Sequence, residues 1–250
     1  MANYGRKTKS AAGQRADMSR ILIHVEGETE ETFVNEVLAP HLYLKGYSKV
    51  SARLVGNARQ RDRRGGIRAW EAVRGDVIRH LKEDQDCLAT LMVDYYGLPQ
   101  TGARAWPGRH AATNLPFEHK ASTVELALLQ DVLEELQLTP EKSRFIPYVM
   151  MHEFEGMLFS DCKLFAEGIG QPQMAARLLA IRNQFDTPEH INDSPETAPS
   201  KRIEALIPSY QKPLFGNIAA LEIGLESIRN ACPHFRDWLE RLEAWVEKSA

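Results

Sequence analysis

A short apolar run that ends on an acid is the feature that most constrains this chain. Residues 21–25 (Ile-Leu-Ile-His-Val) lead directly into Glu26 and Gly27, and then into a stretch rich in glutamate. Runs of this kind are typical of buried strands, a glycine lets the backbone turn sharply, and glutamates suit the first turn of a helix. The pattern predicts a strand, a turn and a helix, with Glu26 at the carboxyl end of the strand, where open α/β sheets bind ligands.

A second apolar run, residues 89–93, also ends on an acid, Asp94. Either acid alone is equally typical of a helix cap or a turn. Because the carboxyl ends of parallel strands share one edge of a sheet, we expect Glu26 and Asp94 to lie together there. Paired carboxylates at such an edge are the oxygen ligands that a hard cation such as Mg²⁺ prefers.

A third acidic segment is His-Glu-Phe-Glu at residues 152–155. The apolar residues that follow recur at helical spacing: Phe154, Met157 and Leu158. In a helix the two glutamates point to different faces, so we expect Glu155 to reach a metal and keep Glu153 as the second choice. A continuing strand would instead place both on one face. His152 is interpreted either as a ligand or proton shuttle, or as a structural histidine whose ring nitrogens are satisfied.

Predicted strands and helices alternate along the first 151 residues, which favours a mainly parallel sheet covered by helices. The strands are expected at residues 20–25, 50–55, 87–93 and 144–151, and the helices at residues 28–45, 68–82 and 122–136. Pro40 is expected to kink the first helix. Ser122 and Glu125 have the spacing of a capping box at the start of the third. The long segment 95–118, between the third predicted strand and the third predicted helix, has no regular pattern. Such a segment is typical of a functional or mobile loop.

Only helices are predicted after residue 152. They are expected at residues 154–159, 173–183, 199–210, 217–230 and 235–248. We therefore divide the chain into a loose basic tail (1–18), an α/β core (19–160) and a helical C-terminal subdomain packed on the core (161–250).

The composition is that of a globular protein and excludes several classes. A hydrophobic content of 43% is enough to fill a core, and a net charge of −3 gives no overall attraction to nucleic acid, so any such surface is local. Three scattered cysteines argue against a disulfide framework and for a reducing cytoplasm. No apolar run is long enough to cross a membrane.

Two basic segments are candidates for phosphate binding. One is rich in arginine and includes Arg63 and Arg64; the other, with Lys201 and Arg202, opens a predicted helix. The arginine fork donates paired hydrogen bonds to phosphate, and the first N–H groups of a helix attract anions. The alternative for the arginine-rich segment is a solvated loop. The chain has no Gly-rich loop ending in Lys-Ser/Thr, so ATP hydrolysis is not expected, and no dinucleotide fingerprint, nucleophile elbow or zinc-ligand spacing is present.

Five segments together resemble the bacterial family DUF4276, which is Toprim-like, the fold of topoisomerases, primases and nucleases of the overcoming-lysogenization-defect (OLD) type. The segments are residues 25–30, 93–99, 144–148 with 152–155, 188–193 and 199–202. The resemblance covers nearly all of the chain after the tail. It implies a mainly parallel Toprim-like sheet with flanking helices, followed by an α-helical C-terminal part.

The resemblance also implies roles for individual residues. Glu26 resembles the Toprim glutamate that acts as general acid/base or approaches the metal, and Asp94 resembles the first metal-binding aspartate. Tyr96 stands where the second aspartate of that pattern is expected, which removes one oxygen ligand. We interpret Glu155 or Glu153 as its replacement.

The activity implied by this resemblance is that of a nuclease dependent on Mg²⁺ or Mn²⁺ that acts in defence against phage or plasmids. DNA and RNA are not distinguished, and a homodimer is left open. Related systems often pair a Toprim-like protein with an ATPase from the same operon, so such a partner is expected. The rival hypotheses are a non-catalytic scaffold that binds an ATPase or nucleic acid, and a phosphatase or phosphotransferase acting on a nucleotide.

Overall fold

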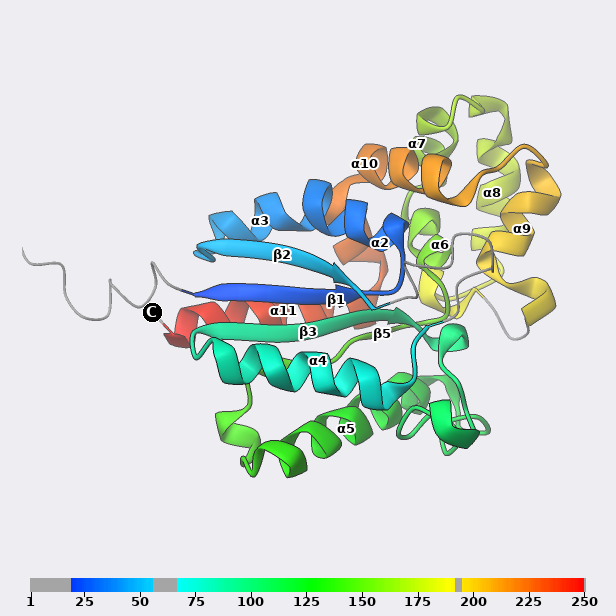
Figure 1. Ribbon diagram of the computed structural model, residues 1–250. Coiled ribbons are helices and arrows are strands. Elements are labelled where there is room, and N and C mark those ends of the chain that lie inside the picture. The colour runs from blue at the N-terminus through cyan, green and yellow to red at the C-terminus, as the bar shows by residue number, and fades with distance from the viewer. Residues whose placement is uncertain (1–18, 56–66, 192–194, 250) are drawn as a thin grey trace, which may run out of the picture.

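A parallel sheet forms the centre of the molecule (Figure 1). The computed structural model describes residues 19–55, 67–191 and 195–249. Within them the strands are β1 (Arg20–Val25), β2 (Lys49–Leu54), β3 (Cys87–Asp94), β4 (Phe145–Ile146) and β5 (Val149–Met150). The strand order is β2-β1-β3-β4, and β5 pairs with β3 beyond β4; every pairing is parallel. The predicted mainly parallel sheet is confirmed.

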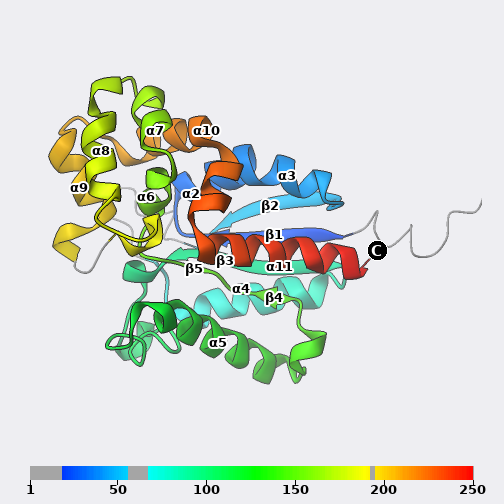
Figure 2. The same cartoon turned by 180° about the vertical axis from the view of Figure 1, so that it is seen from behind.

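Helices cover both faces of this sheet (Figures 1 and 2). The helices of the first half are α2 (Glu28–Phe33), α3 (Ala39–Leu44), α4 (Trp70–Glu83) and α5 (Phe117–Leu136). Those of the second half are α6 (Phe154–Met157), α7 (Cys162–Gly168), α8 (Ala175–Arg182), α9 (Pro199–Leu206), α10 (Lys212–Ala231) and α11 (Pro233–Ser249). The flanking helices and the helical C-terminal part are as expected.

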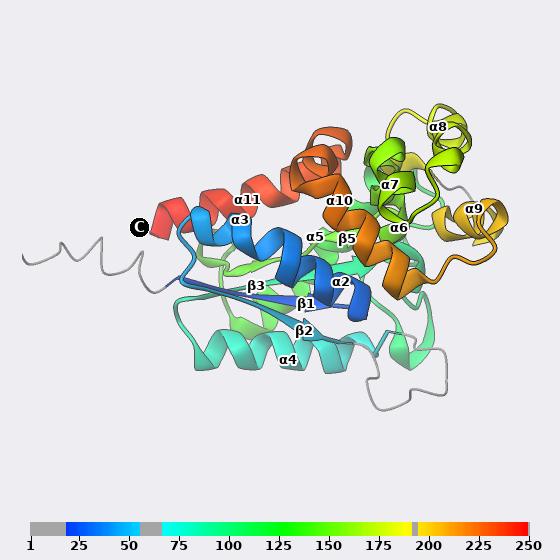
Figure 3. The ribbon, with the colours of Figure 1, turned by 90° about the horizontal axis from the view of Figure 1, so that it is seen from above.

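The alternation of side chains along the strands divides the core into two layers. On one face of the sheet, Ile21, Ile23 and Val25 of β1 lie in one apolar cluster with residues of the covering helices. These helices are α2, α3, α10 and α11, and Figure 3 shows them from above. Alternate residues of β3, such as Leu91, pack with α4 and α5 on the other face. Because β3 lies between two strands and under two layers of helices, residues 87–93 are buried throughout, which explains their continuous apolar run.

The first helix is continuous but irregular around its proline. A π-helical turn, Val34–Leu38, joins α2 to α3, and the Ala39 N–H donates to the carbonyl of Val34, five residues back. Pro40 has no N–H to donate and its ring crowds the preceding turn, so the wider turn ahead of it accommodates the proline. The predicted distortion at Pro40 therefore takes the form of a π-helical turn.

Two expectations about elements are wrong, and one helix was missed. Helix α5 begins at Phe117 with Pro116 at its N-cap, so Ser122 lies inside the helix and caps nothing. The strand expected over residues 144–151 is split into β4 and β5, because Pro147 lies between them and has no N–H for the ladder. Helix α7 was not predicted; Asp161 caps it by accepting hydrogen bonds from the N–H groups of Lys163 and Leu164.

The last helix, α11, packs against the sheet (Figure 2). The Trp238 indole N–H donates to the hydroxyl of Thr90 in β3, with 2.9 Å between the two atoms, and the Trp238 ring stacks on Tyr148. Residues before and after position 160 thus contribute to one apolar core. The division into a core and a C-terminal subdomain at this position stays a prediction.

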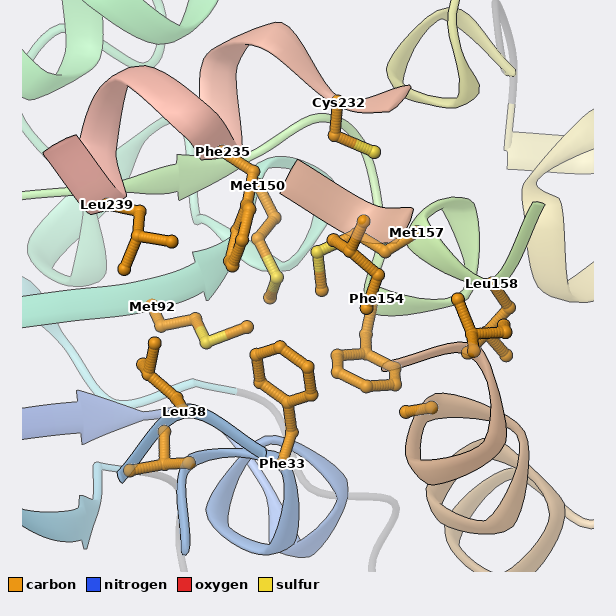
Figure 4. Close-up of a cluster of buried hydrophobic side chains, with 14 of the residues drawn as sticks. Phe33, Leu38, Met92, Met150, Phe154, Met157, Leu158, Cys232, Phe235 and Leu239 are labelled. Atoms are coloured by element: carbon orange, nitrogen blue, oxygen red, sulfur yellow. The ribbon is translucent and has the colours of Figure 1, made fainter. Parts of the chain in front are cut away.

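An apolar cluster closes the core at the carboxyl edge of the strands (Figure 4). The ring of Phe33 in α2 meets Phe154 of α6 edge to face with centroids 5.5 Å apart, and Phe235 of α11 at 6.1 Å. Met92 and Met150, near the ends of β3 and β5, fill the space beside them. Since Glu153 and Glu155 flank Phe154 in the chain, this cluster anchors the segment that carries them.

Candidate functional site

The strand register brings the first two acids to one edge. Val25 pairs with Met92, so Glu26 follows β1 at nearly the same level at which Asp94 ends β3. The Asp94 backbone favours the charged form of the Glu26 carboxyl group and so lowers its pKa, although burial outweighs this effect. Gly97, in the turn after β3, packs directly on that carboxyl group: a Cβ added there would lie 2.7 Å from Glu26 Oε2. The turn after β3 therefore requires glycine at this position for Glu26 to keep its place.

The third acidic segment folds over the same edge. Glu153 is the N-cap of α6 in extended conformation, and the Phe154 N–H donates to Asp94 Oδ1 with 3.1 Å between N and O. Because Glu153 precedes the helix, the two glutamates do not diverge as expected for neighbouring helical positions. Both approach the Lys212 ammonium at the start of α10: Glu155 Oε2 lies 3.2 Å from Nζ and Glu153 Oε2 lies 3.9 Å away.

A fifth carboxylate, Glu30 of α2, completes the group. Its Oε2 accepts a hydrogen bond from the Gly27 N–H with 3.0 Å between the atoms, and the residue is only 6% exposed. We call Glu26, Glu30, Asp94, Glu153 and Glu155 together the acidic cluster. Glu30 was grouped in the sequence with the other glutamates of its helix start, but it alone among Glu28, Glu30 and Glu31 turns inward and is buried.

Burial, together with repulsion from neighbouring carboxylates, makes Glu26, Asp94 and Glu155 hard to ionise. Burial, and next the charge of Glu30, raises the pKa of Glu26 to about 7. Burial likewise raises the pKa of Glu155 to about 7, against the lowering influence of Lys212. The pKa of Asp94 is raised well above its usual value by burial and then by the charges of Glu26 and Glu30. Near neutral pH Glu26 and Glu155 are therefore partly protonated, and a bound cation would displace these protons.

Lys212 supplies positive charge to this cluster. Burial alone would lower the pKa of Lys212, but the carboxylates of Glu155 and Glu153 outweigh burial and raise it. The lysine side chain is 41% exposed, so the cluster opens to solvent on its side. One ammonium among five carboxyl groups leaves negative charge that a further cation or bound protons would balance.

The donor set fits a hard divalent cation in its chemistry. It consists of carboxylate oxygens, and Glu26 Oε2 is buried without a hydrogen-bond partner, which is costly unless something else binds it. Over residues 19–55, 67–191 and 195–249, however, no three His, Cys, Asp or Glu side chains converge closely enough to hold an ion as they lie. Binding would require the carboxylates, now turned partly towards Lys212, to rotate.

The two further candidates, Tyr96 and His152, lie beside the cluster. Tyr96 follows β3 in the turn between Asp94 and Gly97, and its ring stacks on that of His152 with centroids 5.1 Å apart. His152 is 2% exposed and precedes Glu153 directly. The tyrosine therefore brings a ring, and no carboxylate oxygen, to the turn after Asp94.

The candidate phosphate-binding residues divide into two groups. Arg63 and Arg64 lie outside the described residues. Helix α9 begins at Pro199 as predicted, but the N–H of Ser200 donates to Glu153, so the anion held at this helix start is a carboxylate of the cluster. Lys201 pairs with Glu204 at 2.7 Å, and Arg202 donates to the Thr197 carbonyl.

Glu30 of the acidic cluster and Lys212 beside it are the two residues of the site that the sequence motifs did not single out. Lys212 lies almost 60 positions after Glu155 and is followed by a proline, an ordinary helix start. Only the packing of α10 against α2 and α6 brings it to the acids. For Glu30 a signal existed, since a glutamate three residues after a helix N-cap commonly bonds back to the cap backbone.

With the fold and the cluster described, comparison with known proteins identifies the family. The family model described as "Domain of unknown function (DUF4276)" matches residues 25–243, and the chain belongs to this family. The resemblance drawn from the five sequence segments is thus confirmed. No curated protein is significantly similar to the chain in sequence.

Two solved structures resemble the chain loosely. The C-terminal region of the Burkholderia pseudomallei OLD protein matches with 16% identity, a TM-score of 0.46, and coverage of 92% of this chain and 99% of that one. The C-terminal region of the Xanthomonas campestris pv. campestris OLD protein matches with 15% identity, a TM-score of 0.35, and coverage of 89% and 97%. Within the described residues, no helix is both long and apolar enough to span a membrane.

Proposed function

We propose that the chain is a metal-dependent nuclease of Toprim-like type that cleaves phosphodiester bonds. The observation that carries the proposal is the acidic cluster at the carboxyl edge of a parallel sheet, with the unpartnered oxygen of Glu26 inside it. Clustered carboxylates with raised pKa values are common at catalytic sites, because folding leaves them strained by mutual repulsion until a ligand relieves it.

Asp94, Glu155 and Glu26 are the proposed ligands of Mg²⁺ or Mn²⁺, with Glu153 as a fourth. Such an ion, when bound, polarises a phosphodiester oxygen and lowers the pKa of an attacking water. Glu26, whose pKa is raised by burial in the metal-free protein, is the proposed group that takes up the proton of that water at its carboxylate and releases it afterwards. Lys212, at the solvent side of the cluster, is placed to attract the phosphate backbone, and Lys201, Arg202, Arg63 and Arg64 stay proposed as further phosphate contacts.

The wider setting also belongs to the proposal. The resemblance to the family supports a role in defence against phage or plasmids and an ATPase partner. The three cysteines, all of them free, support a cytoplasmic location. The substrate is nucleic acid, either DNA or RNA. A homodimer stays open.

A second function, a non-catalytic scaffold that binds an ATPase or nucleic acid, is favoured by one observation. Lys212 already lies against Glu155 and Glu153 and partly neutralises the cluster, while Tyr96 brings no carboxylate. In a scaffold Lys212 would stay in contact with Glu153 and Glu155 permanently, and divalent ions would not bind at the site.

Cleavage assays separate the two. Supercoiled plasmid, single-stranded DNA and RNA are incubated with the protein in Mg²⁺, Mn²⁺ or EDTA. We expect cleavage with the two metals and none in EDTA, and a loss of at least about 100-fold in Glu26→Gln and Asp94→Asn. Glu167→Gln on the exposed surface of α7 is the matched control and should cleave normally. No cleavage by the wild type with either metal would favour the scaffold, and equal cleavage by all variants would show that the acidic cluster is not the catalytic site.

A further inference from the structure

Four aromatic rings form a connected row beside the acidic cluster. Tyr96 stacks on His152 with centroids 5.1 Å apart, His152 contacts Phe117 at 5.6 Å, and Phe117 stacks on His190 at 3.8 Å with 27° between the ring planes. We call these four rings the aromatic row. They come from four separate segments: the turn after β3, the turn after β5, the first residue of α5, and the turn Pro188–His190.

The row begins at the acids. Tyr96 lies between Asp94 and Gly97, the glycine that packs against the Glu26 carboxyl group, and His152 immediately precedes Glu153. The same two turns that position the acids therefore also position the first two rings. A ligand held on the row would have its next atoms near the carboxylates.

The rings are held firmly yet are not fully covered. His152 is 2% exposed, whereas Tyr96, Phe117 and His190 each keep part of their surface in solvent. The Arg109 guanidinium lies 3.8 Å from the centroid of the Tyr95 ring, and its Nε donates to the Tyr95 carbonyl at 2.9 Å. This contact fixes the turn that carries Tyr96, so little conformational entropy remains to be lost when a flat ligand stacks.

We propose that the aromatic row is a stacking platform for unpaired nucleobases, so that the substrate is single-stranded, or locally unpaired, nucleic acid. This inference rests on the proposed function, because it takes the acidic cluster to act on the adjacent phosphate. Rings stack on the face of any base and so tolerate all sequences, and in a duplex those faces are covered by neighbouring base pairs.

Binding measured without cleavage tests the platform. In a Glu26→Gln background, fluorescence anisotropy compares four oligonucleotides of equal length: dT20, rU20, a duplex, and a chain of abasic sites with the same phosphates. We expect dT20 or rU20 to bind at least about tenfold more tightly than the abasic chain and the duplex. The two single-stranded arms decide between DNA and RNA. Equal affinity for the abasic chain would overturn the inference without requiring any variant of the row.

Variants of the row refine the result. Phe117→Leu and His190→Leu keep bulk and remove the ring, and each should weaken binding of the single strand about tenfold while leaving the abasic chain unchanged. Tyr43→Leu is the matched control, because this ring is 48% exposed and lies on α3, whose end is at the opposite edge of the sheet. Unchanged single-strand affinity in folded His190→Leu and Phe117→Leu, checked by thermal melting, would show that the rings serve packing alone.

Failure of this inference can be told apart from failure of the proposed function. A protein that binds unpaired bases through Phe117 and His190 but leaves every oligonucleotide intact in Mg²⁺ and Mn²⁺ keeps the platform and loses the nuclease. A protein that cleaves duplex and single strand equally, with the ring variants fully active, keeps the nuclease and loses the platform.

Discussion

At the residue scale, the site depends on close contacts that particular residue types permit. Gly97 is the clearest case, because an added Cβ would lie 2.7 Å from one Glu26 carboxylate oxygen and 2.9 Å from the other. Its backbone does not require glycine for conformational reasons; the side chain of Glu26 does. The position of a proposed catalytic acid is thus fixed by a residue with no chemistry of its own.

We expect Gly97→Ala to displace the Glu26 carboxylate and to weaken Mn²⁺ binding at least about tenfold. Isothermal titration measures the affinity, and a thermal melt checks that the fold persists. Gly75→Ala is the control, since nothing lies within 4 Å of an added Cβ there and the change in mid-helix should stabilise by about 0.5–1 kcal/mol. Unaltered Mn²⁺ affinity in Gly97→Ala would show that Glu26 is not a ligand.

Lys212 is the second residue whose role can be measured. Lys212→Gln removes the ammonium that balances Glu153 and Glu155. The metal-free variant should be less stable at pH 8, by less than the ~3–5 kcal/mol lost when a fully buried pair is broken, because Lys212 is partly exposed. Mn²⁺ should then raise its melting temperature more than that of the wild type, with Lys163→Gln, 77% exposed, as the control. A destabilised variant that Mn²⁺ does not rescue would favour the scaffold.

Four of the five acids of the cluster were candidates from local sequence. Glu26 and Asp94 end apolar runs, and Glu153 and Glu155 lie where a run gives way to a helix, so each has a signal within a few residues. Lys212 has none, because its neighbours in space come from distant parts of the chain. The shared approach of Glu153 and Glu155 to one lysine depends on where α6 begins, and a helix start is uncertain by a residue or two in any sequence pattern.

At the element scale, one buried acid caps a helix from a distant part of the chain. Helix α11 begins at Pro233, and Glu189, from the loop before α9, accepts hydrogen bonds from the N–H groups of His234 and Phe235, each with 3.0 Å between N and O. A carboxylate at this position also meets the positive end of the helix dipole. Glu189 thereby ties the C-terminal helix to a loop more than 40 residues earlier.

We expect Glu189→Ala to lower the free energy of unfolding by about 1–2 kcal/mol, because two helix N–H groups lose their acceptor in a buried place. Urea denaturation followed by circular dichroism measures the change. Glu247→Ala, exposed on the same helix, should shift stability by less than about 0.5 kcal/mol. Similar unfolding midpoints for the two variants would contradict the capping role.

Elements were predictable where one local signal dominates. Residues 20–25 form β1 with the predicted bounds, since an apolar run between polar residues leaves little choice. The capping box at Ser122 is wrong because Glu125, its supposed partner, is needed elsewhere: its Oε1 accepts from the Val149 N–H and pairs with His234. That use depends on tertiary packing, which a four-residue motif cannot reveal.

At the scale of the whole molecule, alternating strands and helices were enough to predict the parallel sheet and its covering helices. The placement of α10 and α11 was not predictable, because helices without intervening strands carry no topological rule. Their packing supplies Lys212 to the site and Trp238 to the core. The order of elements thus predicts the edge where the acids meet, while the closing of the site over that edge is a tertiary property.

The acidic cluster should also control stability as a function of pH. Glu26 and Glu155 have pKa values raised from 4.5 to about 7 by burial. The folded state therefore binds more protons than the unfolded state between these values, so their contribution is complete below about pH 4.5 and is lost as the pH rises through about 7. Metal-free protein should therefore lose this contribution as the pH rises from about 4.5 to about 7. Below about pH 6.5 the lowered pKa of His24 has the opposite effect and partly offsets the loss.

Glu26→Gln isolates this effect from the other titrating groups. The variant should be more stable than the wild type at pH 8, by on the order of 2 kcal/mol, and should show little advantage near pH 5, where Glu26 is protonated. Denaturant midpoints across the pH range measure the difference. A stability difference between the variant and the wild type that does not increase with pH would mean that burial does not disfavour the ionised form of Glu26.

Titration of Mn²⁺ into the metal-free protein tests most directly whether the acidic cluster is a metal site. Isothermal titration calorimetry should show saturable binding to the wild type and to Glu167→Gln, weakened by at least about tenfold in Glu26→Gln and in Asp94→Asn. Absence of binding to the wild type, or equal binding to all four proteins, would contradict the account and leave the cluster neutralised by Lys212 and by protons.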